Sequence, residues 1–291
     1  MPELPEVEVT RRSLSPVLLG RRISAVKTTK PSYVFVTSPA RLRGALRGRT
    51  PVAIDRLGKY LLFRLDDGHT LVVHLGMTGQ LFSAAATSPR LLSATARASL
   101  PPEEQVLFKP DIHTHVVLSF DDSGPDVYFR DVRKFGKLFL LKEGEVHPRL
   151  ERLGLDALEV TGEHLFAVSR KRKTAIKALL LDQAVVAGVG NIYADEALFF
   201  AGVRPGRRAS RLTRVEAERL SDSIGKVLRR SIKTGGSSIS DYIAPDGRDG
   251  AYQDERHVYA RKGEACKVCG TPITRRVVAQ RSAHYCPTCQ R

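Results

Sequence analysis

The stretch MPELPEVE, residues 1–8, places an amine and two carboxylates together at one end of the chain. A small residue after an initiator methionine normally permits its removal, which would give Pro2 a free secondary amine. Such an α-amino group titrates at about pH 8, so a useful fraction is unprotonated at neutral pH and can attack a carbon electrophile. Glu3 stands beside this amine, and Glu6 follows one helical turn later on the same face. The stretch therefore predicts a nucleophile with an adjacent acid or base.

The same residues also predict the start of an amphipathic helix. Pro5 suits the first turn of a helix, where acidic side chains interact favourably with the helix dipole. The apolar face of this helix would consist of Leu4, Val7, Leu14 and Leu18. Taken alone, the stretch favours this structural interpretation, and the rest of the chain favours the catalytic one.

Composition indicates a globular protein with a polyanionic partner. At 291 residues the chain can form two domains with a small appendage. Its formal net charge is +16 and its pI is near 10.0. Nineteen basic and nine acidic residues between Arg204 and Arg291 supply +10 of that charge. An excess concentrated in this way predicts a binding face for nucleic acid.

The distribution of apolar residues and cysteines predicts an intracellular protein. No apolar run reaches the roughly 18 to 20 residues of a membrane span, and the first residues lack the apolar region of a signal peptide. We therefore expect a cytosolic protein, or a nucleoid-associated one in a prokaryote. In a reducing compartment, four cysteines in two CxxC pairs indicate a metal site rather than disulfides.

The order of predicted elements divides the chain into four segments. Short β-branched and aromatic runs separated by turns predict an antiparallel sandwich or barrel. Ala84–Gln105 interrupts them, and its Ala, Ser and Pro content predicts an exposed insertion loop. Helical patterns follow. The expected segments are a β-rich catalytic domain at 1–150, a helical DNA-binding domain at 151–236, a loop and linker at 237–260 and a zinc finger at 261–291.

The cysteine spacing is the most specific local pattern. Cys266, Cys269, Cys286 and Cys289 form C-x2-C-x16-C-x2-C, the spacing of a four-thiolate zinc site. Such a site leaves no ligand position for water, so we expect one structural Zn²⁺ and no organic cofactor. The intervening residues can form a hairpin on which Arg275, Arg276 and Arg281 could contact phosphates or bases. A zinc hairpin can equally bind protein, and only the charge favours DNA.

A glycine-flanked turn, VVAGVGNIYADE at 185–196, precedes a predicted helix. Gly188 and Gly190 permit close approach of a ligand to the backbone, and Asn191 can cap the helix. Exposed amides at a helix N-terminus form an anion site that suits a DNA phosphate. Taken alone this pattern is weak, because many helical hairpins use such a turn for packing.

Two further turns, HLGMTGQLF at 74–82 and DVRKFG at 131–136, carry side chains suited to damaged DNA. Met77 and Phe135 can wedge between bases, and Arg133 can bond an unpaired base edge. For Met77 or Phe135 alone, a core position is the commoner role. Lys59, in RLGKY, could be a catalytic amine or a phosphate ligand, although an exposed lysine in a hairpin is the commoner case.

Together these segments resemble the formamidopyrimidine-DNA glycosylase (Fpg/MutM) family of bifunctional DNA glycosylases. The matching pieces, MPELPEVE, RLGKYLL, HLGMTG, DVRKFG, AGVGNIYADEALF, VYARKGEAC and the CxxC…CxxC tail with AQR, occur in the family's order along the whole chain. The resemblance implies an α+β multidomain fold. This fold has an N-terminal antiparallel β-sandwich with an N-terminal helix, a helix–two-turn–helix domain and a zinc-finger hairpin, with DNA in the cleft between them.

The resemblance also implies a function and its residues. The expected enzyme removes oxidised purines (8-oxoguanine and formamidopyrimidines) from double-stranded DNA and cleaves abasic sites by β,δ-elimination. The expected catalytic residues are Pro2, Glu3, Glu6, Lys59 and Arg281. The expected DNA-binding residues are His74, Met77, Arg133, Phe135, Asn191, Tyr193 and Arg281. Within this set, Met77, Arg133 and Phe135 match the triad that fills the gap left by the flipped base. The segment 237–252 corresponds to the family's damaged-base loop.

Two alternatives remain open. An endonuclease VIII-type enzyme would prefer oxidised pyrimidines, but Leu4, where that branch tends to have glycine, and DVRKFG favour the purine branch. A zinc-dependent DNA-binding protein without catalysis is the alternative if Met1 is retained, because a blocked amine cannot form an iminium. The sequence carries no oligomerisation signal, so we expect a monomer.

Overall fold

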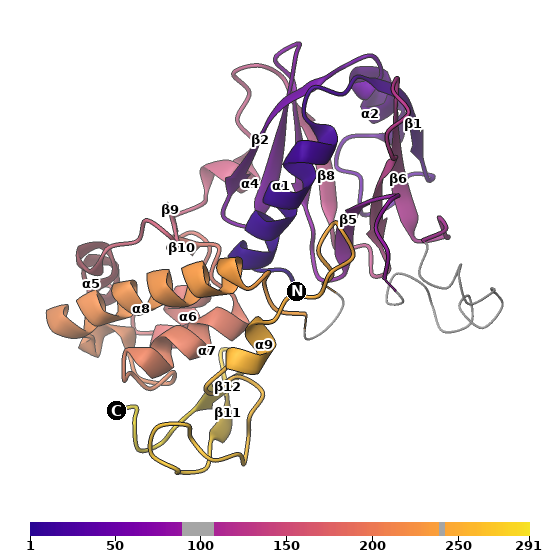
Figure 1. Ribbon diagram of the computed structural model, residues 1–291. Helices are drawn as coiled ribbons and strands as arrows, with labels where there is room; N and C mark the ends of the chain where they lie inside the picture. Colours follow the sequence, from indigo (N-terminus) through magenta and orange to yellow (C-terminus); the bar gives the residue numbers. More distant parts are fainter. Residues whose placement is uncertain (89–107, 239–241) are drawn as a thin grey trace. The chain divides into compact units, whose positions relative to one another are not determined.

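The protein is represented by a computed structural model that describes residues 1–88, 108–238 and 242–291 (Figure 1). These residues form two compact units. The first comprises Met1–His147 and Gly235–Ala251, and the second comprises Pro148–Thr234 and Tyr252–Arg291. The segment after residue 234 thus returns to the first unit, and the four segments expected from the sequence stay a prediction.

Two four-stranded antiparallel sheets make up most of the first unit. One has the order β1–β6–β7–β5, with β1 at Ile23–Thr28, β6 at Thr114–Phe120, β7 at Val127–Asp131 and β5 at Gly79–Ser83. The other has the order β2–β3–β4–β8, with β2 at Pro51–Leu57, β3 at Tyr60–Leu65, β4 at Thr70–His74 and β8 at Lys137–Leu141. The expected antiparallel β-rich architecture is confirmed.

One hydrophobic core is shared by both sheets and by two helices, α1 (Leu4–Leu18) and α2 (Pro39–Leu46). Successive strand residues point to opposite faces, so alternate residues such as Leu81 and Phe129 enter this core. The buried face of α1 includes Leu4, Val7, Leu14 and Leu18, as its spacing predicts. Burial of this face holds the N-terminus of α1 in a fixed place.

The start of the expected insertion differs from the prediction. Residues 89–107 lie outside the described part of the chain. Before them, Ala86 and Ser88 are buried rather than exposed, and Phe108 after them is buried as well. Ala86 and Phe108 belong to a second, smaller hydrophobic cluster. Ala85 and Thr87 are exposed as expected, so the prediction fails at this edge only where packing partners from elsewhere in the chain cover residues such as Ala86.

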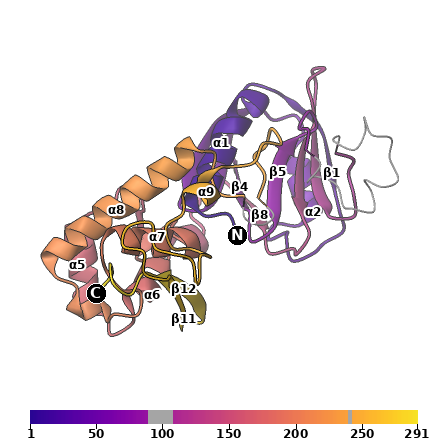
Figure 2. The ribbon, with the colours of Figure 1, turned by 60° about the horizontal axis from the view of Figure 1, so that its bottom comes forward.

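The second unit is mainly helical and ends in a β-hairpin (Figure 2). Its helices are α4 (Pro148–Glu151), α5 (Gly162–Arg170), α6 (Ile176–Leu181), α7 (Asn191–Phe200), the 3-10 helix η3 (Ala209–Arg211), α8 (Arg214–Lys233) and α9 (Tyr252–Glu255). Its strands are β9 (Leu155–Asp156), β10 (Val186–Ala187), β11 (Thr274–Val278) and β12 (Arg281–Tyr285). The first pair is parallel, and β11 and β12 form the antiparallel hairpin.

The longest helix, α8, shows how sequence sets these boundaries. Thr213 caps its N-terminus and forms a reciprocal capping box with Glu216, which satisfies amides that the helix leaves free. Its apolar residues recur on one face, which packs against α5 and α7. Among the described residues, no helix is both long and apolar enough to cross a membrane.

Candidate active site and DNA-binding surfaces

The N-terminus of α1 brings two carboxylates together beside Pro2. Glu3 is the N-cap residue, and Pro5 lies in the first turn. The backbone amide of Glu3 donates to Glu6 Oε2 at 2.8 Å, and Glu3 accepts in turn from the amide of Glu6. Glu3 is only 2% exposed and Glu6 is fully buried. Carboxylates are rarely buried unless they are paired or functional, so this pair is more than an ordinary helix cap.

Glu6 also holds a segment that is distant in sequence. The amide of Ser237 donates to Glu6 Oε1 at 2.8 Å. Gly236 has φ of +84°, and a Cβ there would lie 3.1 Å from Glu6 Oε1, so glycine suits this close approach. One carboxylate therefore joins the start of α1 to residues 236–237, and the amino-acid spacing gives no sign of this.

Lys59 occupies the tight turn between β2 and β3. Leu57 and Tyr60 pair across it, and Gly58 takes the left-handed conformation with φ of +55°. Lys59 is buried rather than exposed as hairpin lysines usually are. A buried ammonium group requires polar or anionic partners, so Lys59 is not the solvated hairpin lysine that is the commoner case.

Arginine side chains surround Glu8 on the polar side of α1. Arg11 and Arg12 contact Glu8 Oε1 at 2.8 and 2.7 Å, and Arg56 contacts Oε2 at 3.2 Å. Burial acts to raise the pKa of Glu8, but the hydrogen bonds from Arg11 and Arg12 outweigh it and lower the pKa to about 2. Glu8 is therefore ionised at neutral pH and anchors α1 to the hairpin that carries Lys59.

The turn after β4 and the turn after β7 lie against each other. A Cβ on Gly76 would come within 2.5 Å of the backbone of Phe135 and Gly136, so only glycine permits this approach. His74 Nδ1 accepts from the Gly76 amide at 3.1 Å, and the His74 ring packs on Tyr60 with 4.7 Å between centroids. Two segments that are distant along the chain thus become one surface.

This surface presents the three predicted gap-filling side chains. Phe135 is 50% exposed, Arg133 is exposed and Met77 is half-buried. The Arg133 guanidinium lies 4.9 Å from the centre of the Phe135 ring, a cation–π distance. Phe135 is therefore not a core residue, and an exposed aromatic beside a cation suits contact with bases.

Asp131 and Thr78, whose roles the sequence did not reveal, tie these two turns together. Thr78 donates its hydroxyl to Asp131 Oδ1 and accepts the Arg133 amide at 3.0 Å. Asp131 Oδ2 accepts the Gly136 amide at 2.7 Å. The Asp131 side chain is fully buried. An aspartate at the start of DVRKFG was visible in the sequence, but its burial was not.

In the second unit, the start of α7 differs from the prediction. Gly190 is the N-cap residue, with an extended backbone, and Asn191 is the first residue of the helix. The prediction that Asn191 caps α7 was wrong, because glycine already supplies the extended conformation that a cap requires. Asn191 Oδ1 is buried, and no hydrogen-bond partner for it lies among the described residues.

The side chain of Tyr193 is buried within the second unit. Its side chain is 1% exposed, its hydroxyl lies 2.5 Å from Ser231 Oγ on α8, and its ring packs near Tyr252. That Tyr193 binds DNA stays a prediction, and its buried ring and hydroxyl are engaged in packing. The sequence shows only that Tyr193 follows a ligand-binding turn, and the helix face that it occupies is a matter of packing.

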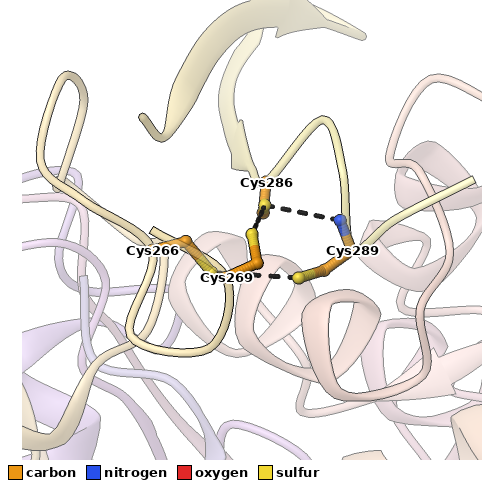
Figure 3. Close-up of side chains that lie close together, drawn as sticks. All are labelled: Cys266, Cys269, Cys286 and Cys289. Atoms are coloured by element: carbon orange, nitrogen blue, oxygen red, sulfur yellow. Dashed lines mark hydrogen bonds between the residues drawn. The ribbon is translucent and has the colours of Figure 1, made fainter. Parts of the chain in front are cut away.

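The four cysteines lie together at the base of the β11–β12 hairpin (Figure 3). Their sulfur atoms lie within 4.8 Å of one another, with Cys266 to Cys289 at 3.9 Å and Cys269 to Cys286 at 3.4 Å. Zn–S bonds of about 2.3 Å in a tetrahedron require sulfur separations of about 3.8 Å. The cluster therefore fits a structural Zn²⁺ held by four thiolates.

The hairpin displays cations and is fixed by a buried ion pair. Arg275, Arg276 and Arg281 are exposed. Lys177 on α6 donates to Asp195 Oδ1 on α7 and to the carbonyl of Ser282, both at 2.6 Å. Asp195 Oδ2 also accepts the His284 amide at 2.8 Å.

Lys177 and Asp195 are both fully buried. Through the Ser282 carbonyl and the His284 amide, this pair holds β12 on both sides of Ala283, close to Arg281. A lysine inside the apolar run AIKALLL was the one available sign of this pair in the sequence, and it was missed.

Comparison with known proteins identifies three domains in this order. The formamidopyrimidine-DNA glycosylase N-terminal domain matches residues 1–138, the H2TH domain of the same enzyme matches 153–243, and a zinc finger found in FPG and IleRS matches 263–291. The fold and these matches define a DNA-repair glycosylase with a zinc finger.

Full-length relatives agree with these matches. The chain is 41% identical to a formamidopyrimidine-DNA glycosylase of Solibacter usitatus, with both chains covered in full, and 44% identical to one of Symbiobacterium thermophilum over 100% of this chain and 89% of the relative. The chain belongs to the formamidopyrimidine-DNA glycosylase family, whose members are bifunctional glycosylase/AP lyases.

Solved structures resemble the chain over nearly its full length. The MutM (Fpg) protein from Thermus thermophilus superimposes with a TM-score of 0.83 and 40% identity, covering 99% of this chain and 98% of that one. A Lactococcus lactis Fpg mutant in complex with DNA containing Fapy-dG has a TM-score of 0.85 and 34% identity, with both chains covered in full. The expected three-part architecture is confirmed.

Proposed function

We propose that the enzyme excises 8-oxoguanine and formamidopyrimidines from double-stranded DNA and that Pro2 is its nucleophile. The observation that carries this proposal is the buried pair Glu3 and Glu6 at the start of α1. It places an acid and a second carboxylate directly beside the amine that Pro2 gains once Met1 is removed. Bacterial relatives crystallised with Fapy-dG and abasic DNA support the substrate class.

The first step replaces the bond to the base with a bond to Pro2. The amine nitrogen attacks C1′ of the extruded nucleotide, the bond from C1′ to the base breaks, and the base leaves with one proton. Glu3 then donates a proton to the ring oxygen as the bond between C1′ and that oxygen breaks, and the nitrogen lone pair forms the iminium. Glu6 positions Glu3 through the Glu3 amide and holds Ser237 in place.

The second step cleaves the strand. The cationic iminium acidifies the C2′ proton, a base removes it, and the electron pair expels the 3′ phosphate. A second elimination expels the 5′ phosphate. We assign Lys59 to contacts with the damaged nucleotide, because a lysine buried in the hairpin beside α1 is held rigidly.

DNA recognition is divided between the two units. In the first, Met77, Arg133 and Phe135 fill the gap left by the extruded base, with Arg133 facing the orphaned cytosine and His74 supporting the turn. In the second, Asn191 and Arg281 bind phosphate. The chain acts on DNA as a monomer in the bacterial cytoplasm, where the chromosome lies.

Borohydride trapping tests the proposal. The enzyme is incubated with an 8-oxoguanine duplex and borohydride, which reduces an iminium to a stable amine, and the adduct is located by peptide mass spectrometry. An adduct on Pro2 supports amine catalysis and the lesion class together. Glu3→Gln, which keeps the size of the side chain but removes the acid, is expected to lower turnover by at least about a hundredfold.

Two outcomes would change the assignment. Much faster processing of a thymine-glycol duplex would reassign the enzyme to oxidised pyrimidines. The absence of an adduct with Pro2 free would indicate a different lesion or a protein that binds DNA without catalysis.

A further inference from the structure

The first unit has a second hydrophobic core on the outer face of one sheet. Leu81 and Phe129 are paired on β5 and β7 and enter the main core, so the neighbouring pair Phe82 and Tyr128 points to the opposite face. Phe108 completes an aromatic cluster there, with ring centres 4.5 Å from Phe82 and 5.3 Å from Tyr128. We call Phe82, Ala86, Phe108 and Tyr128 the aromatic dock. All four are buried, so another segment must cover them.

That segment is Tyr242–Ala251, which lies beside β5 in both ribbon views (Figures 1 and 2). Ile243 is 4% exposed and packs into the aromatic dock. The Ser83 amide donates to the carbonyl of Pro245 at 3.2 Å. Gly247 has φ of +90°, and a Cβ there would lie 2.4 Å from the carbonyl oxygen of Thr87. Side-chain packing and backbone contact thus hold this segment on the sheet.

The base of the same segment is held beside the proposed active site. Gly250 donates its amide to Ser238 Oγ at 2.9 Å, and a Cβ on Gly250 would lie 2.2 Å from the Gly236 carbonyl oxygen. Ser237, which follows Gly236, donates its backbone amide to Glu6 Oε1. The base of the segment is therefore held against residues 236–238, which Glu6 bonds in turn, and the rest of it lies on the aromatic dock.

The insertion in this chain starts at the aromatic dock, and the chain is back at the dock at Phe108, just after the insertion. Ala86 precedes residues 89–107 and Phe108 follows them, and both side chains are buried in the dock. The insertion and the residue shortly after it therefore each supply one of the four residues that pack against Ile243. A change at these flanks acts directly on the docked segment.

We propose that the aromatic dock determines substrate specificity by positioning the described segment Tyr242–Ala251 against the extruded damaged base. This inference rests on the proposed function and on the expectation, from the family resemblance, that this part of the chain is the damaged-base loop. The residues of the aromatic dock are positioning residues, since they act through the loop rather than on the reacting atoms. An abasic site presents no base for the loop to hold. Loosening the dock should therefore impair base excision and spare strand cleavage at abasic DNA.

The test compares two phenylalanines on outer sheet faces. Phe108→Ala loosens the dock, and Phe139→Ala is the matched control, because Phe139 is equally buried on the outer face of the other sheet. For Phe108→Ala we expect kcat/KM on an 8-oxoguanine duplex to fall about tenfold or more, since small misplacements of positioning groups are costly. Cleavage of an abasic duplex should change by less than about twofold. The control should leave the ratio of the two rates unchanged.

A backbone variant tests the same contact without altering the aromatic side chains. Gly247→Ala places a Cβ against the Thr87 carbonyl in a left-handed conformation and should reproduce the selective loss. Hydrogen exchange provides a readout independent of activity. The amides of Ala244 and Gly247 form hydrogen bonds within the docked turn. They should exchange faster in Phe108→Ala and in Gly247→Ala, and not in the control Phe139→Ala.

Equal losses on the two substrates, or unchanged exchange at Ala244 and Gly247, would overturn the proposal. If the wild-type enzyme cleaved neither substrate, the proposed function would fail on its own. The exchange data would still decide whether the aromatic dock holds the loop.

Discussion

Replacing Lys177 with methionine should strongly destabilise the second unit. Lys177 and Asp195 are fully buried, and the ammonium group also bonds the Ser282 carbonyl at 2.6 Å. Methionine keeps most of the side-chain volume but leaves the Asp195 charge without its cation. Removing one partner of a buried ion pair typically costs about 3–5 kcal/mol. The amide of His284 still bonds Asp195, so we expect a loss near the lower end of that range.

Denaturant unfolding followed by far-UV circular dichroism measures this loss, and release of zinc to a chromophoric chelator reports on the finger in the same unit. Arg230→Met is the matched control in this unit. Arg230 pairs with Glu255, but its side chain is 51% exposed, so its loss should cost far less stability than the loss of Lys177. A second variant, Lys177→Met with Asp195→Asn, removes both charges and keeps an acceptor for His284. It should regain at least about 1 kcal/mol relative to Lys177→Met alone.

A buried-pair role would be refuted if Lys177→Met cost no more than Arg230→Met, or if the double variant regained no stability relative to Lys177→Met. Either result would mean that the pair is solvated or replaced by other contacts. A large cost with zinc release at lower denaturant would support the assignment of Lys177 and Asp195 as the anchor of β12 and hence of Arg281.

Four further outcomes are expected. Chelation of zinc should unfold the finger and abolish tight DNA binding, which circular dichroism and fluorescence anisotropy can follow; binding that survives complete metal removal would contradict this. Thr78→Val should reduce the preference for cytosine opposite the lesion by about fivefold, because Arg133 and Asp131 lose the same hydroxyl, whereas Thr78→Ser should restore it. The pKa of Glu8 in the folded protein is about 2, below its ordinary value of 4.5, so its contribution to stability is present above pH 4.5 and is lost as the pH falls towards 2. Unfolding measured across that range should show a shallower decline for Glu8→Gln. Arg281→Ala should lower the salt dependence of DNA affinity by about one phosphate contact, and an unchanged slope would remove Arg281 from the phosphate contacts.

Residues that act within a few positions of one another could be predicted without the structure. The two CxxC pairs place thiolates at the spacing that a tetrahedral zinc requires, and the cluster has that geometry. The buried stripe of α1 follows from helical periodicity. The β2–β3 hairpin follows from a short turn between two apolar runs. Local geometry decides these features.

The exact boundary of a helix and the burial of a single side chain were harder to predict. Gly190 rather than Asn191 caps α7, because two adjacent residues could both adopt the cap conformation. Tyr193 has an apolar ring and a polar hydroxyl, so its sequence position fits a core or a surface equally well. In the folded protein Tyr193 packs against α8 and is buried.

The sequence by itself determined the family, the order of the domains and the zinc ligands, because each depends on short motifs whose residues are close along the chain. The tertiary structure alone decided which polar groups are buried and what they hold. Glu6 binds Ser237, Asp131 joins the turns of Thr78 and Gly136, and Ile243 rests on aromatic residues far from it in sequence. The cost of burying a charge or an apolar side chain depends on partners supplied by the whole fold, and no spacing rule encodes those partners.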